Sequence, residues 1–274
     1  MAKATDGNKT ESTGSLAGKV ALVTGGSRGI GRAIALQLAA QGMTVAICAR
    51  NTDSLEQTAA DIEEAGVRCL RYVTDVSQPV DIENLFKQLT VDAGGLHVLV
   101  NNAVTSTSAS FDQLTDEEFQ YHIDVKLLAY IRIARLALAM MKKQQQGRIV
   151  NIGGMTARVV APLRMTNGVV NAGVANFTKQ FAGFAAGSGV TVNCVHPGYT
   201  ATERVQQIFE REAAQSGSTV NDVVKRRTED IPLGRLINPE DIANAVLFFC
   251  SPEAAMVTGQ CIAVDGGSGT AVTY

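Results

Sequence analysis

Short apolar runs rich in β-branched residues alternate along the chain with longer amphipathic stretches. The runs predict strands at Val20–Thr24, Thr44–Cys48, Arg68–Val73, Val98–Asn101, Arg148–Ile152, Thr191–Val195 and Gln260–Val264. The longer stretches predict helices near Ile30–Gln41, Ser54–Ala65, Val80–Asp92, Asp116–Lys143, Gly168–Ala186 and Pro239–Ser251. A helix in nearly every gap between strands is typical of a parallel sheet covered on both faces. We therefore predict an α/β fold with a doubly wound, seven-stranded parallel sheet.

One segment, residues 201–236, breaks this alternation between the sixth strand and the last helix. Such connections usually have about 2–6 residues. The composition of the segment is charged and favourable to helix, so we predict a small helical flap. Because it follows the carboxyl end of a strand, where ligands bind in such sheets, we expect it to cover a small-molecule substrate. We predict a flexible tail at residues 1–17 and a single domain at 18–274.

Charge and cysteine content narrow the function classes. The formal net charge of −2 over 274 residues gives no electrostatic reason to expect binding to nucleic acid or to an anionic membrane. No apolar run reaches the roughly 20 residues that span a bilayer. The first seventeen residues are polar and lack the apolar centre of a secretory signal peptide. The five cysteines are scattered, which favours reduced, buried thiols and a cytoplasmic protein.

A glycine-rich turn follows the first predicted strand, in Thr24-Gly-Gly-Ser-Arg-Gly-Ile-Gly31. Glycines at such a turn let backbone amides approach a pyrophosphate at the helix N-terminus. This turn is accompanied by Asn101-Asn102-Ala103, Ala172-Gly-Val, Val195-His-Pro-Gly198 and Val264-Asp-Gly-Gly267. Together these motifs resemble those of the short-chain dehydrogenase/reductase family, in particular its 3-oxoacyl-acyl carrier protein reductase-type members. The resemblance implies a Rossmann fold that binds a nicotinamide dinucleotide and assembles as a homodimer or homotetramer.

The charges around the predicted nucleotide pocket favour NADP(H). Relatives that prefer NAD carry an acidic residue after the second strand, where this chain has Ala49-Arg50-Asn51. Arg28 and Arg50 with no opposing carboxylate suit the additional phosphate of NADP. From the motifs and the resemblance, we predict that the cofactor is bound by Gly25, Ser27, Arg28, Gly29, Ile30, Gly31, Arg50, Asn51, Asp75, Val76, Asn102, Ala103, Asn171, Pro197, Gly198, Thr200 and Thr202.

The catalytic pattern of the family is Tyr-x-x-x-Lys, with a serine thirteen residues before the tyrosine and an asparagine on an earlier helix. Anchoring on Ala172-Gly-Val places Asn167 at the tyrosine, Asn171 at the lysine and Gly154 at the serine, and the asparagine falls on Asp124. The resemblance thus implies that all four catalytic positions are replaced. Asparagine is no general acid and glycine has no side chain to donate, so ordinary carbonyl reduction is expected to be impaired.

The remaining candidate chemistry is sparse. Asp124 is the ionisable member of the replaced set, and we expect it to be buried and to act as an acid or base, or else only to bond the local backbone. Arg158 and Arg164 are candidates for holding a carboxylate or phosphate of the substrate. The histidines have no cysteine or carboxylate partner at metal-ligand spacing along the chain, so we predict no metal site.

Three hypotheses about function remain open. The chain is an atypical NADPH-dependent reductase acting on a group that needs no tyrosine acid, such as an imine, a quinone or an activated alkene. Alternatively it is a redox-neutral dehydratase, cyclase or isomerase that uses Asp124, Asn167 and Asn171. The third hypothesis is a non-catalytic, nucleotide-binding subunit.

Overall fold

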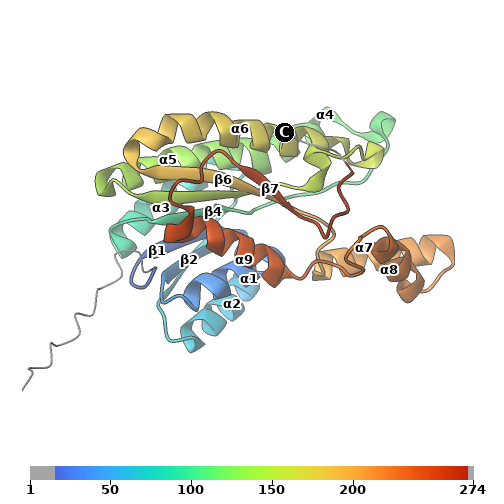
Figure 1. The fold of residues 1–274 in the computed structure, drawn as a ribbon, viewed down its shortest axis with the longest axis horizontal. Coiled ribbons are helices and arrows are strands. Elements are labelled where there is room, and N and C mark those ends of the chain that lie inside the picture. Colours follow the sequence, from blue (N-terminus) through green and yellow to red (C-terminus); the bar gives the residue numbers. More distant parts are fainter. Residues whose placement is uncertain (1–15, 271–274) are drawn as a thin grey trace, which may run out of the picture.

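The computed structural model describes residues 16–270, in which the strands form a seven-stranded sheet ordered β3-β2-β1-β4-β5-β6-β7 (Figure 1). Every neighbouring pair is parallel. The reversal of strand order between β1 and β4 is the switch point at which doubly wound sheets bind ligands. The predicted sheet is confirmed, with strands β1 Val20–Thr24, β2 Thr44–Ala49, β3 Cys69–Val73, β4 Val98–Asn101, β5 Gly147–Ile152, β6 Val190–Pro197 and β7 Cys261–Val264.

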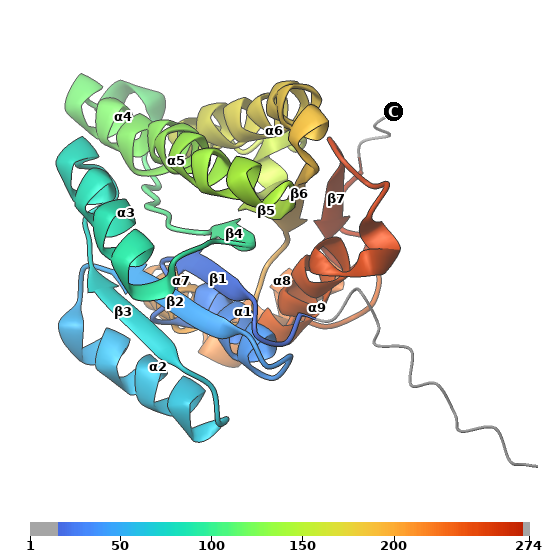
Figure 2. The same cartoon turned by 90° about the vertical axis from the view of Figure 1, so that its left-hand side faces the viewer.

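Helices cover both faces of the sheet because the central strands are apolar on both sides (Figure 2). One face carries α1 Gly29–Ala39, α2 Thr52–Glu64 and α9 Pro239–Cys250. The other carries α3 Pro79–Ala93, α4 Asp116–His122, α5 Ala129–Gln144 and α6 Met165–Ala185. Each face has its own apolar core, with Ile34 and Phe249 fully buried in the first and Tyr130 in the second.

The single helix predicted over Asp116–Lys143 is interrupted in the structure. Between α4 and α5 the chain forms a π-helical segment, Ile123–Leu128. A π-helical turn contains more residues than an α-helical turn, so it changes which side chains face the sheet, and such turns are frequent at functional sites. A helical pattern of 3.6 residues per turn does not reveal this shift.

Two helices, α7 Glu203–Ser216 and α8 Val220–Glu229, form the segment predicted as a flap. They stand out from the sheet layers (Figure 1) and share a small apolar core of Phe209, Ala213 and Val223. Their role over a substrate remains a prediction. Most of the predicted tail, residues 1–15, lies outside the described residues. Among residues 16–270, no helix is long and apolar enough to cross a membrane.

Candidate functional site

The glycine-rich turn between β1 and α1 has the geometry of an anion cradle. Gly25 and Gly29 have φ of 63° and 54°, a conformation that favours glycine. A Cβ on Gly31 would overlap the carbonyl oxygen of Gly25, so the turn closes tightly onto the helix. The N-terminus of α1 has no side-chain cap, which leaves its positive dipole end open to a phosphate group.

Asn102, at the carboxyl end of β4, fixes the position of this turn. Its side-chain Nδ2 donates to the carbonyl oxygens of Thr24 at 3.0 Å and Gly25 at 3.1 Å. Its backbone N–H donates to Thr24 Oγ1 at 2.9 Å. The Asn102 amide is therefore engaged with the glycine-rich turn, which it supports from the neighbouring strand.

The two arginines predicted to bind a phosphate are both exposed. Arg50 donates to the Tyr121 hydroxyl at 2.7 Å. Within the described residues, neither Arg28 nor Arg50 forms an ion pair with a carboxylate. Asn51 next to Arg50 uses its side chain to cap α2, accepting from the Ser54 amide at 2.8 Å. This edge of the turn is thus positively charged and has no internal counter-ion.

The other predicted cofactor residues lie on the same side of the sheet, in the turn or after the carboxyl ends of β3, β4 and β6. Asp75 Oδ1 accepts from the Ser77 amide at 2.9 Å. A Cβ on Gly198 would lie 2.8 Å from the Asp265 Cα, so only glycine allows this close approach. The remaining members are the short turn and strand-end residues Ser27, Ile30, Val76, Ala103, Pro197, Thr200 and Thr202.

Two buried asparagines on α6 and the glycine after β5 form one cluster. Asn167 and Asn171 are only 7% and 4% exposed. Asn171 Nδ2 donates to Thr156 Oγ1 at 2.8 Å, whereas its Oδ1 is buried without a hydrogen-bond partner among residues 16–270. A Cβ on Gly154 would lie 2.6 Å from Asn171 Nδ2, so the asparagine amide occupies the space next to the glycine. Gly154 and Asn171 are therefore mutually dependent.

Asn167 is held much more loosely than Asn171. Its Oδ1 accepts from Ser106 Oγ at 3.4 Å, and its Nδ2 donates to the Thr105 carbonyl at 3.5 Å. Both distances are at the long limit for such bonds. A buried amide with weak internal bonds retains most of its capacity to bond a ligand.

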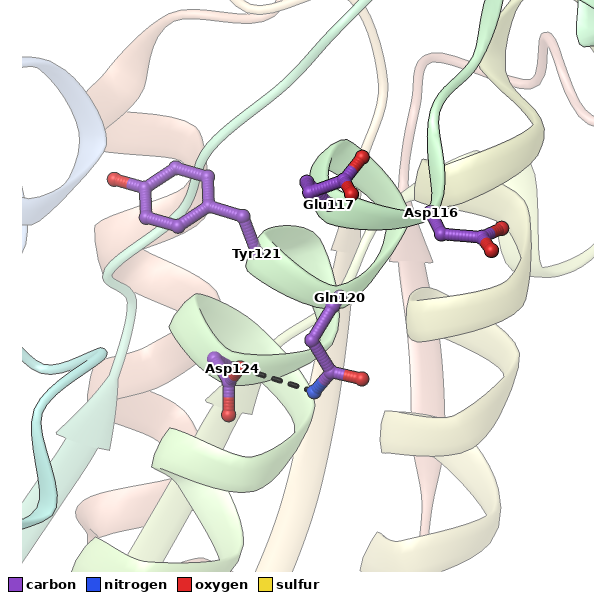
Figure 3. A pocket seen from close by; sticks show the side chains of 5 residues that line it. All are labelled: Asp116, Glu117, Gln120, Tyr121 and Asp124. Atoms are coloured by element: carbon purple, nitrogen blue, oxygen red, sulfur yellow. Dashed lines mark hydrogen bonds between the residues drawn. The ribbon is translucent and has the colours of Figure 1, made fainter.

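Asp124, the fourth predicted member, lies apart from this cluster. Its carboxylate accepts from Gln120 Nε2 at 3.0 Å and lies 3.6 Å from the Arg132 guanidinium. It lines an open depression on α4 together with Asp116, Glu117 and Tyr121 (Figure 3). Its side chain is 27% exposed, so the expected burial is wrong. Asp124 therefore bonds residues of its own helical region, Gln120 and Arg132, and not the asparagines of α6.

Lys126, two residues later, is the residue that sequence reasoning missed. It is 4% exposed, and its Nζ donates at 2.8 Å to the carbonyl of Gly153, next to Gly154. Within the described residues it has no carboxylate partner. Burial therefore lowers the pKa of Lys126 to about 8, only partly opposed by Cys194. A positive charge thus lies behind the glycine of the cluster.

Arg158 and Arg164, the two arginines predicted to hold an anionic group of the substrate, have different surroundings. Arg158 donates to the Cys261 carbonyl at 2.6 Å and is thereby attached to β7. Burial, and then the nearby positive charges of Arg164 and Arg28, lower the pKa of Arg204. Arg164 therefore lies close to Arg204, which is at the start of the flap. In the described part of the chain, no carboxylate pairs with Arg158, Arg164 or Arg204. The structure thus adds Arg204 to the candidates.

A second cluster contains a histidine and two cysteines, although the spacing along the sequence predicted no such partners for the histidines. The ligand atoms of Cys194, His196 and Cys261 all lie within 4.8 Å of one another. Cys194 and His196 belong to β6, and Cys261 is the partner of Cys194 across the parallel pair β6–β7. Sequence spacing did not predict this cluster because strand pairing brings together positions 67 residues apart.

A Gly154→Ala variant tests the dependence between Gly154 and Asn171. The added Cβ would displace the Asn171 amide from Thr156, and we expect the free energy of unfolding to fall by about 1–3 kcal/mol. Adding Asn171→Ala should recover part of this loss in a double-mutant cycle. Gly187→Ala is the matched control, because its Cβ would meet open space. Equal effects of the two glycine substitutions in denaturant unfolding would refute the coupling.

Comparison with known proteins identifies the class to which this fold and site belong. Residues 25–269 match a family model described as "Enoyl-(Acyl carrier protein) reductase". The chain is 36% identical over 253 residues to 3-oxoacyl-[acyl-carrier-protein] reductase of Vibrio cholerae, covering 92% of this chain and 98% of that protein. It is 34% identical over 254 residues to the NADPH-dependent reductase BacG of Bacillus subtilis, covering 91% and 97%.

Solved structures agree with this grouping. L-sorbose reductase from Gluconobacter frateurii, complexed with NADPH and L-sorbose, superposes with a TM-score of 0.91 at 28% identity, covering 94% of this chain and 99% of that one. A variant of actinorhodin polyketide ketoreductase with NADPH gives 0.89 at 32% identity, covering 93% and 98%. The fold and the matches define a Rossmann-type oxidoreductase. The chain belongs to the short-chain dehydrogenase/reductase family.

Proposed function

We propose that this chain is an NADPH-dependent reductase that adds hydride to an activated alkene, a C=C bond conjugated to a carbonyl group. The relatives include NADPH-dependent reductases. The open α1 N-terminus fits NADP(H), as do Arg28 and Arg50, which have no carboxylate partner within residues 16–270. When bound, NADPH supplies the hydride. The finer choice of substrate rests on the residues of the asparagine cluster.

The observation that carries this choice is the buried, weakly bonded amide of Asn167. We propose that Asn167, Asn171 and Gly154 replace the proton-delivering residues of the family. An amide donates hydrogen bonds but releases no proton at neutral pH. Reduction of a ketone needs a proton at oxygen, which an asparagine does not provide.

An activated alkene fits an amide wall better than a ketone. Hydride forms a C–H bond at the β carbon, the C=C electron pair forms a new double bond between the α carbon and the carbonyl carbon, and the C=O π pair moves to oxygen, giving an enolate. The Asn167 N–H groups can bond that oxygen as its negative charge develops. The α carbon subsequently takes a proton from water, which completes the saturated product. The ammonium of Lys126 behind Gly153 adds positive charge on the same side.

The guanidinium groups of Arg164 and Arg204 suggest a substrate that also carries a carboxylate or phosphate. Both lack a carboxylate partner within residues 16–270, and Arg204 lies at the base of the flap. Thr202, two residues before Arg204, lies close to Gly29 of the glycine turn. A substrate anion held there would lie between the flap and the nucleotide cradle.

The redox-neutral alternative loses its main support, because the carboxylate of Asp124 bonds Gln120 and faces the depression in Figure 3. Imines and quinones are the alternative hydride acceptors for the same amide wall. The non-catalytic subunit makes no use of the buried Asn167 amide. Assembly as a homodimer or homotetramer and a cytoplasmic location remain predictions.

A matched pair of thioesters tests the proposal directly. We expect an α,β-unsaturated thioester to consume NADPH at least about 10²-fold faster than the 3-oxo thioester of equal length, followed by absorbance at the NADPH band. Mass spectrometry should show a product with two additional hydrogens per NADPH oxidised. An imine and a quinone complete the panel.

Each other outcome contradicts the proposal in a defined way. Equal or faster turnover of the 3-oxo thioester would show that the protein is an ordinary carbonyl reductase. Faster turnover of the imine or quinone would show that the substrate belongs to that class and not to the activated alkenes. Product without NADPH oxidation would favour the redox-neutral alternative, and NADPH binding without turnover of any substrate would favour the non-catalytic subunit.

A further inference from the structure

The cluster of Cys194, His196 and Cys261 lies beside the asparagine cluster but has no part in the proposed reaction. The two cysteines are direct partners on β6 and β7. Paired strands lie about 4.8 Å apart, which falls within the Cα separation that a disulfide requires. Cys194 is fully buried, whereas Cys261 is only partly buried, at the beginning of the last strand of the sheet. Cys261 is thus the less buried member of the pair, and Cys194 is shielded from solvent.

The hydrogen bonds of His196 decide how its ring meets the two sulfur atoms. Nδ1 lies 3.0 Å from the backbone nitrogen of Gly154 and accepts its N–H. The neutral ring must therefore carry its proton on Nε2, which lies 3.9 Å from Cys194 Sγ. A protonated Nε2 donates to a sulfur and has no free lone pair for a metal ion. The ring thus favours a stabilised thiolate over a metal site.

The environment distinguishes Cys261 from the other four cysteines. The hydrogen bond with Cys261, and then burial, raise the pKa of Cys194. Hydrogen bonds from Cys194 and His196 lower the pKa of Cys261, with Arg158 nearby. Burial raises the pKa of Cys48, Cys69 and Cys250 to about 12. A thiolate that is partly exposed is the reactive form of cysteine, and a thiol buried in apolar surroundings is inert.

We propose that Cys261 and Cys194 are a peroxide-reactive dithiol, with Cys261 as the attacking thiolate, Cys194 as the resolving thiol and His196 as the residue that orients the thiolate. The attack forms an S–O bond and breaks the O–O bond of the peroxide, whose other oxygen leaves as an alcohol or water after taking up a proton. Cys194 Sγ then attacks Cys261 Sγ, and the hydroxide released takes the Cys194 proton as water. Two thiols and one peroxide give one disulfide, one alcohol or water, and one water.

The experiment exposes the reduced full-length protein to a small excess of hydrogen peroxide and maps its cysteines by mass spectrometry after thiol blocking. We expect the loss of two hydrogens and a crosslinked peptide pair that contains Cys194 and Cys261. Cys261→Ser should slow peroxide consumption at least about tenfold, since the attacking thiolate is removed. Cys69→Ser, which alters a buried thiol that bonds the Leu70 carbonyl, is the matched control.

A second variant keeps the test independent of folding. Cys194→Ala removes the resolving thiol and one hydrogen bond to the thiolate, so the first step should slow and a sulfenic acid should still accumulate at Cys261, trapped by dimedone. Oxidation of the wild-type protein at other cysteines first, or no crosslink at all, would overturn the proposal. So would uptake of one equivalent of zinc that blocks alkylation of both thiols, because the cluster would then be a metal site.

Discussion

An Asn167→Asp variant is expected to lose about 10²–10³-fold in kcat for the activated alkene, the effect of removing one donor from a site that stabilises an oxyanion. The two side chains have nearly the same size, so the change replaces two N–H donors by a negative charge at a position that is 7% exposed. That charge repels the developing enolate instead of bonding it. NADPH affinity, measured by quenching or enhancement of its fluorescence, should change little, because the residue acts on the substrate oxygen.

Asn176→Asp is the matched control, since Asn176 is an exposed asparagine on the same helix, α6. It should leave kcat within about twofold of the wild type, as is usual for surface substitutions. An Asn167→Asp variant with normal kcat and normal stability would show that the amide does not contact the reacting oxygen. A loss of stability with unchanged kcat would assign Asn167 a structural role only.

Lys126→Met is expected to stabilise the protein at neutral pH and to lose this advantage at high pH. Burial lowers the pKa of Lys126 from 10.5 to about 8. Below pH 8 the lysine is charged in both the folded and the unfolded chain. The burial of this charge destabilises the folded chain by about 3 kcal/mol, since each pKa unit corresponds to about 1.4 kcal/mol. The lost bond to the Gly153 carbonyl offsets roughly 1 kcal/mol of the gain in the variant.

The pH dependence has a defined sign. Between pH 8 and 10.5 the folded chain loses the Lys126 proton while the unfolded chain retains it, so the stability of the wild type rises with pH. The advantage of Lys126→Met should therefore shrink by about 2 kcal/mol between pH 7 and pH 10. Guanidinium unfolding at both pH values measures it, with Lys143→Met at an exposed position of α5 as control. A difference that does not change with pH would show that the lysine titrates normally.

The sheet could be predicted because its signal is local. Each strand is a short β-branched run, and the glycines of the first turn follow one of them directly. The predicted strands agree with the structure to within a few residues, for example Val98–Asn101 at β4 and Gln260–Val264 against Cys261–Val264 at β7. The burial of both faces of a parallel sheet leaves few other ways to place such apolar runs.

The members of the candidate site could be predicted only where one helix or one turn holds them. Asn167 and Asn171 are four residues apart on α6, so helical geometry places them on one face. Asp124 was expected beside them because the resemblance places the family's catalytic asparagine at that position. In the structure Lys126 bonds the Gly153 carbonyl, whereas Asp124 bonds Gln120, one helical turn before it.

The sequence by itself determined the alternation of strands and helices, the glycine turn, the charge around the nucleotide pocket and the asparagine pair. Only the tertiary structure decided which charged group lies behind the cluster and which cysteines meet. Lys126 is buried because a helix packs across the end of β5, and Cys194 meets Cys261 because β6 pairs with β7. Contacts between distant segments depend on strand order and register, which no local pattern of side chains encodes.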